Sequence, residues 1–157
     1  MEWGDAILWK AVKATPGALE DADVKERLFH IHFTQYAFHQ AWIGEKFERL
    51  KSEDFDSLSD VEKWMRGNYP AMLSFLNSID DTQLNAPMPL PWAVYFGRQL
   101  GREVEMTTLG ETMLQVSNHS IHHRAQVNMQ VGKHGGKPPL IDYIAWLWSG
   151  RPAADWD

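Results

Sequence analysis

Hydrophobic side chains recur along this chain every three to four residues, the spacing of helices that bury one face, and they do so in four main segments. The first predicted helix covers residues 3–13 and ends before Pro16 and Gly17, which break the pattern. The second runs from about Asp23, a good N-cap residue, to about Leu50 and is rich in aromatic side chains. Both segments are expected to pack their apolar faces against other helices.

The third and fourth predicted helices have clearer signals at their ends. The third follows a Ser/Asp-rich stretch and covers about residues 61–79, where Pro70 is expected to kink or divide it. The fourth opens at Thr108 and Glu111, the two positions of a capping box, in which each side chain satisfies the free backbone amide of the other. A stretch rich in glycine and proline, residues 132–139, ends it.

Two shorter elements complete the predicted secondary structure. After a Pro-rich stretch, the apolar and glycine-containing run of residues 92–106 is typical of a short, irregular β-hairpin laid across the helices. Residues 140–148 predict a short C-terminal helix. Since no linker, repeat or low-complexity tract separates these elements, residues 1–157 are expected to form one all-α domain built on a four-helix bundle.

Composition excludes several classes of function. The formal net charge is -6 and no long cluster of Lys or Arg is present, which argues against nucleic acid as a partner. The chain has no cysteine, so thiolate metal ligands and a cysteine nucleophile are excluded. It shows neither a secretory leader nor an apolar run long enough to cross a membrane, and a cytoplasmic protein is expected.

Eight tryptophans are unusual in a chain of 157 residues, and three of them, Trp146, Trp148 and Trp156, lie within the last dozen positions. These side chains either pack into the core and its edges or form a docking surface, since exposed aromatic residues concentrate at interfaces.

The fourth helix carries three histidines in five residues, His119, His122 and His123. His119 and His123 are four residues apart, so they project from one face a single turn apart and can reach one metal ion. Because Val116 and Val127 share that face, the two imidazoles are expected to point inward. A histidine pair alone is as compatible with a hydrogen-bonded core as with a metal site, and a third ligand is needed.

The third ligand is expected from a facing helix, because helix bundles assemble metal sites from facing helices. The third helix has no histidine, whereas the second has His30, His32 and His39. Three protein ligands with one open position is the arrangement of catalytic zinc-like sites. Spacing alone does not decide which histidine of the second helix takes part.

Three stretches of this chain resemble a known family. They are Leu-Phe-His-Ile at residues 28–31, Asn-His-Ser-Ile-His-His-Arg-Ala-Gln at residues 118–126, and Gly-Gly-Lys-Pro-Pro-Leu-Ile-Asp-Tyr at residues 135–143. Together they resemble the DinB/YfiT-like superfamily of bacterial metal-binding four-helix bundles, over nearly the whole chain. The resemblance implies an up-down-down-up bundle and a homodimer.

The resemblance also implies a three-histidine site for one divalent ion, zinc or nickel above all. The family's ligands on the fourth helix fall on His119 and His123. Its ligand on the second helix typically follows two apolar residues, which favours His30 over His32.

A divalent ion held by neutral imidazoles lowers the pKa of a bound water or thiol, which makes a nucleophile. The resemblance therefore implies a metal-dependent thiol S-transferase or hydrolase that acts on a small molecule, with a low-molecular-weight thiol as the cofactor of a transferase. His32, Gln35, His122 and Arg124 are candidates for orienting the ligands or moving protons, although an ion pair to a neighbouring helix is an equal alternative for Arg124. The alternatives to an enzyme are a non-catalytic metal-binding sensor or stress-response protein, and a bundle whose histidines only fill the core.

Overall fold

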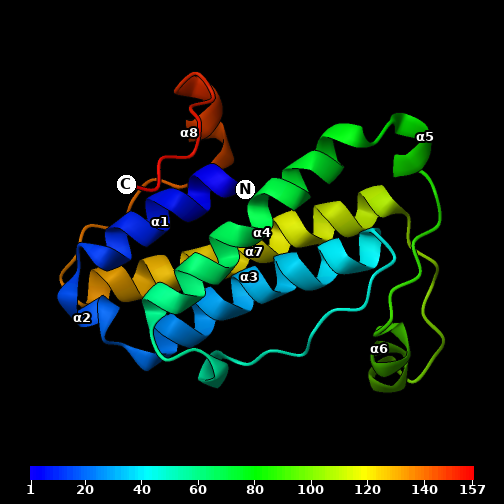
Figure 1. Cartoon of the computed structure of the whole chain (residues 1–157), viewed down its shortest axis with the longest axis horizontal. Coiled ribbons are helices and arrows are strands. Elements are labelled where there is room, and N and C mark those ends of the chain that lie inside the picture. The colour runs from blue at the N-terminus through cyan, green and yellow to red at the C-terminus, as the bar shows by residue number, and fades with distance from the viewer.

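Helices account for all the regular structure in the computed structural model, which describes residues 1–157 (Figure 1). They are α1 (Glu2–Lys13), α2 (Pro16–Leu19), α3 (Ala22–Trp42), the 3-10 helix η1 (Ser52–Asp54), α4 (Leu58–Ser78), α5 (Asp81–Leu84), α6 (Ala93–Leu100), α7 (Leu109–Lys133) and α8 (Tyr143–Trp148). The structure contains no strand, and its single β-bridge is an isolated one between Pro87 and Thr108. None of the helices combines the length and the apolar character that crossing a membrane requires.

The four long helices α1, α3, α4 and α7 form the body of the molecule (Figure 1). α3 packs most extensively against α7, while α4 packs on α3 and α1 on α7. The main hydrophobic cluster takes side chains from all four: Leu8, Trp9 and Val12 of α1, Val24, Leu28, Phe29 and Ile31 of α3, Val61, Met65 and Tyr69 of α4, and Val127 and Val131 of α7. The apolar spacing in the sequence therefore reflects one shared core.

The predicted helix ends are confirmed where a local signal marks them. The hydroxyl of Thr108 accepts a hydrogen bond from the amide of Glu111 at 3.2 Å, and the Glu111 carboxylate accepts one from the amide of Thr108 at 2.7 Å, so the capping box forms as predicted. Pro70 lies inside α4 but does not divide it.

α3 is shorter than the sequence predicted, and its N-cap lies two residues earlier. The carboxylate of Asp21, not of Asp23, accepts the amide hydrogen bonds at the start of the helix. The helix ends at Trp42 rather than near Leu50, because Gly44 takes a left-handed conformation with φ 74° and turns the chain away.

The predicted β-hairpin over residues 92–106 is wrong. Residues of this run form α6, which ends at Gly101 in the left-handed conformation (φ 67°) that caps many helices. A short apolar run fits a strand or a helix equally well by periodicity, so the sequence pattern alone does not decide between them. What remains of the expected pairing lies at the base of the segment, where the amide of Met88 donates to the carbonyl of Thr107 at 2.6 Å.

Two of the three C-terminal tryptophans, Trp156 and Trp148, have different environments. Trp156 packs on Tyr69 with ring centroids 5.7 Å apart, and its indole N–H donates to Glu2 at 3.2 Å. Trp148, on the short helix α8 that begins at Tyr143, is 82% exposed. Trp156 therefore packs against the bundle, whereas Trp148 lies on the surface.

Candidate metal centre

His30 of α3 meets His119 and His123 of α7 on the surface between the two helices. One ring nitrogen from each histidine can be chosen so that all three lie within 4.8 Å of one another, and the Nε2 atoms of His30 and His119 are 3.1 Å apart. The close packing of α3 on α7 places His30 opposite the pair, which are one helical turn apart.

The sequence suggested that the histidines point into the core. In the structure they do not. His30 is exposed, and His119 and His123 are half-buried. The buried stripe of α7 passes through Val116, Ser120, Arg124, Val127 and Val131, among others, so the two histidines lie beside it rather than on it. One residue is about 100° of helix, enough to place a side chain at the edge of the interface.

The surroundings keep two of the imidazoles neutral. Burial first, and then the neighbouring His123 and His30, lower the pKa of His119 to about 4. Partial desolvation of its imidazole, and then His123, also lower the pKa of His30. Both side chains therefore carry a free nitrogen lone pair at neutral pH, the form in which histidine binds metals.

A chain of hydrogen bonds fixes the orientation of His123. Its Nδ1 donates to Oε1 of Gln126 at 2.8 Å, and the same oxygen accepts from Nη1 of Arg27 at 2.7 Å. The amide nitrogen of Gln126 donates to Nε2 of His122 at 3.0 Å. With its Nδ1 proton engaged, His123 leaves Nε2 free for an ion.

Of these partners, Arg27 was not found from the sequence. The available signal was its position three residues before His30, on the same face of α3. His122 contacts Gln126 as well as the ring of His123, with ring centroids 4.9 Å apart, so it belongs to the surroundings of the triad.

A pocket of about 740 Å³ lies beside the triad, and His30 and His119 are among its lining residues. Its walls come from α3, from α7, and from the two segments 43–51 and 88–107, and they are mainly apolar. The sequence placed small residues Thr34 and Ala37 next to His30 on α3, and both line this pocket. A small molecule in the pocket would thus lie against two of the three histidines.

His32, the other candidate on α3, is buried and both of its nitrogens are used. Nε2 accepts from the indole of Trp9 at 2.9 Å, and Nδ1 donates to Oε1 of Gln35 at 3.2 Å. Gln35 in turn donates to Asp5 at 3.0 Å and to Ser120 at 3.2 Å. These two residues therefore belong to a buried polar network and not to the triad.

Arg124 belongs to the same network. Its Nη1 lies 3.0 Å from Oδ1 of Asp5, and the hydroxyl of Tyr69 donates to Oδ2 of Asp5 at 2.7 Å. Burial raises the pKa of Asp5, but Arg124 and the hydrogen bonds outweigh it and hold that pKa below its usual value. The ion pair to a neighbouring helix, one of the two alternatives for Arg124, is the one that forms.

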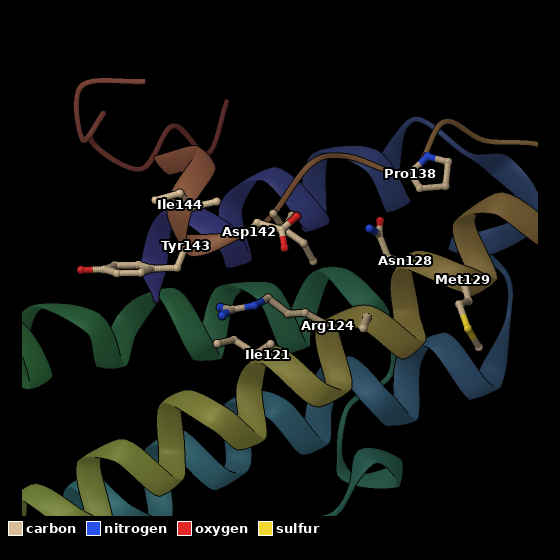
Figure 2. A pocket seen from close by; sticks show the side chains of 10 residues that line it. Ile121, Arg124, Asn128, Met129, Pro138, Asp142, Tyr143 and Ile144 are labelled. Carbon is tan, nitrogen blue, oxygen red and sulfur yellow. The ribbon is translucent and has the colours of Figure 1, made fainter. Parts of the chain in front are cut away.

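Figure 2 shows the side of α7 on which Arg124 lies. Ile121, Arg124 and Asn128 project from α7, with Asp142 and Ile144 across from them, around a second pocket of about 690 Å³.

His39, the third histidine of α3, is buried against Phe75 with ring centroids 5.8 Å apart. It takes no part in the triad.

Comparison with known proteins gave one result. No curated protein and no solved structure shows a significant match to this chain. The family model of the DinB superfamily matches residues 20–127, which include α3, α4 and all three histidines of the triad. Because the match covers more than half of the sequence, this chain belongs to the DinB superfamily.

Proposed function

We propose that this protein is a metal-dependent enzyme, a thiol S-transferase or a hydrolase, in which His30, His119 and His123 bind one divalent ion. The observation that carries the proposal is the convergence of three histidine nitrogens within 4.8 Å at the edge of a pocket large enough for a small molecule.

The three histidines fit such an ion. In a tetrahedral site with bonds of about 2.0–2.1 Å to nitrogen, two ligand atoms are about 3.3 Å apart. The Nε2 atoms of His30 and His119 are 3.1 Å apart, close to that spacing. Neutral imidazoles suit zinc, nickel, copper and iron, and we propose zinc or nickel for this site.

A divalent ion on three neutral ligands keeps its charge and lowers the pKa of a bound water or thiol, which serves hydrolysis and thiol transfer alike. In thiol transfer the sulfur forms a bond to an electrophilic carbon, the leaving group departs with the bonding electrons, and the thiol proton passes to solvent. The residues of this chain supply the rest: Gln126 and Arg27 orient His123, and the apolar pocket excludes water from the substrate.

The scaffold and the assembly are further parts of the proposal. The helix directions in Figure 1, with α3 and α4 running one way and α1 and α7 the other, support an up-down-down-up order.

The exposed apolar side chains around α8, among them Tyr143 and Trp148, support a homodimer. Sedimentation equilibrium at micromolar concentration tests the homodimer, and the mass of a monomer would contradict it.

Metal analysis of purified protein tests the site. We expect one divalent ion per chain, and loss of that ion in His119→Ala and His123→Ala. His134→Ala is the matched control, because His134 bonds Asp21 away from the triad and its loss should leave the metal content unchanged. Full occupancy in either triad variant would overturn the site.

Turnover tests the reaction. Metal-loaded protein should accelerate conjugation of a small thiol to an electrophile, or hydrolysis of an ester, in a broad screen. The rate should fall by orders of magnitude in His123→Ala, because the remaining two ligands do not hold the charge that activates the nucleophile. Stoichiometric metal without turnover of any substrate would instead identify a metal-binding sensor.

A further inference from the structure

We infer that the pocket beside the triad takes an uncharged, aromatic or branched apolar small molecule as the substrate. The inference rests on the proposed function for the reaction, but the binding of such a molecule is a separate property of the pocket.

Aromatic side chains form much of the pocket wall and hold one another in place. Trp92 packs edge-on to Phe38, with ring centroids 4.8 Å apart at 70°, and edge-on to Phe47, at 5.7 Å and 76°. All three line the pocket, and Phe33 of α3 continues the wall from Phe47 at a centroid distance of 6.1 Å. Rings in this geometry form a preformed apolar surface onto which another ring can stack.

Charge is nearly absent from the lining. Eleven of its 18 residues are hydrophobic, and Glu105 is the one acidic residue among them, with no Lys or Arg. An anionic group buried against the aromatic wall, away from the ion proposed at the triad, would have no cation to pair with, which carries a large desolvation penalty. Among the uncharged polar residues of the lining, Thr34 and Gln115 can orient a ligand by hydrogen bonding without requiring a charge.

The mouth of the pocket exposes apolar side chains. Phe96 is 54% exposed and Met106 is 64% exposed, although both line the pocket. Clustered exposed apolar surface of this kind marks binding sites. The segment that carries these residues is anchored at its base, where Met88 bonds Thr107 and Leu109 bonds Ala86, so one wall is tied directly to the start of α7.

The volume of about 740 Å³ matches a small molecule rather than a protein segment, since ligand pockets measure about 300–1,000 Å³. Because His30 and His119 lie in the same lining, an apolar molecule seated on the aromatic wall has part of its surface against the triad. The pocket thus selects the substrate by apolar contact, and the triad lies where the substrate would react.

Two fluorescent probes of similar shape test the inference: neutral N-phenyl-1-naphthylamine and its anionic relative 8-anilinonaphthalene-1-sulfonate. We expect the neutral probe to bind one site per chain of the metal-free protein, at least tenfold more tightly than the anionic one. Thr34→Trp fills the pocket and should weaken the neutral probe at least tenfold. Ala125→Trp, which also introduces a tryptophan but at the second pocket on α7, is the matched control and should bind the probe as the wild type does.

Circular dichroism of each variant shows whether it folds. If Thr34→Trp does not fold, Trp92→Ala, which removes part of the aromatic wall, provides a second test. Equal or tighter binding of the anionic probe would overturn the inference, as would equal effects of Thr34→Trp and Ala125→Trp. The two proposals fail separately. A protein that binds the neutral probe in this pocket but holds no metal contradicts only the proposed function, and one that holds metal but does not bind the probe contradicts only the substrate class.

Discussion

At the scale of single residues, the side chains behind the triad are as informative as the triad itself. The amide oxygen of Gln126 accepts from both His123 and Arg27, and its amide nitrogen donates to His122. This leaves one orientation for the amide and one protonated nitrogen on His123. Arg27 is itself fixed by Asp23, 2.9 Å from its Nε. Partners of this kind typically change metal affinity 10–100-fold when removed.

Arg27→Met is therefore expected to weaken metal binding about tenfold or more while leaving the fold intact. Competition with a chromophoric chelator measures the affinity, and the cobalt-substituted protein reports the ligand geometry in its visible spectrum. Arg66→Met is the matched control, because Arg66 also pairs with an acidic residue four positions earlier on a long helix, but away from the triad. Equal affinities of the two variants would show that Arg27 does not position His123.

At the scale of elements, the start of α7 is the point where the pocket wall and the triad helix meet. The capping box of Thr108 and Glu111 begins α7, and the isolated bridge from Pro87 to Thr108 closes the segment that carries α6. The same residue thus ends the wall and starts the helix that carries His119 and His123.

Thr108→Ala is expected to destabilise the protein by about 0.5–2 kcal/mol, because the amide of Glu111 loses its acceptor. Urea denaturation measures the free energy of unfolding. Thr82→Ala, at an exposed threonine of the short helix α5, is the control and should change that free energy by less than about 0.5 kcal/mol. An equal effect of both substitutions would show that the cap contributes no special stability.

At the scale of the whole molecule, one buried polar network connects the four long helices. Asp5 of α1 accepts hydrogen bonds from Gln35 of α3, Tyr69 of α4 and Arg124 of α7. His32 extends the network to Trp9. Since a buried carboxylate needs all its partners in place, the network favours one relative arrangement of the helices.

Asp5→Ala is expected to destabilise the protein by about 3–5 kcal/mol, because it leaves the charge of Arg124 buried and unpaired. The double variant Asp5→Leu with Arg124→Met removes both charges and should lose less. Asp155→Ala, which breaks the exposed pair with Lys10, is the control and should leave the free energy of unfolding close to that of the wild type. Urea denaturation measures all three, and a double variant less stable than Asp5→Ala would contradict this account.

The sequence alone determined the features that depend on local spacing. The four long helices, the capping box of α7 and the adjacency of His119 and His123 follow from periodicities and short motifs that act within a turn or two of chain. A histidine of the second helix was expected as the third ligand because bundles assemble metal sites from facing helices, and where spacing alone did not decide, the family resemblance favoured His30 over His32.

The tertiary structure decided what depends on how helices pack. It placed His30 against the pair and His32 in the buried network, paired Arg124 with Asp5, and turned the triad toward a pocket instead of the core. It also made a helix of a run that reads equally as a strand, α6. The positions of the side chains depend on which face of a helix each residue occupies, and a shift of one residue changes that face by about 100°. All of these outcomes also depend on contacts between residues far apart in the chain, which no local pattern records.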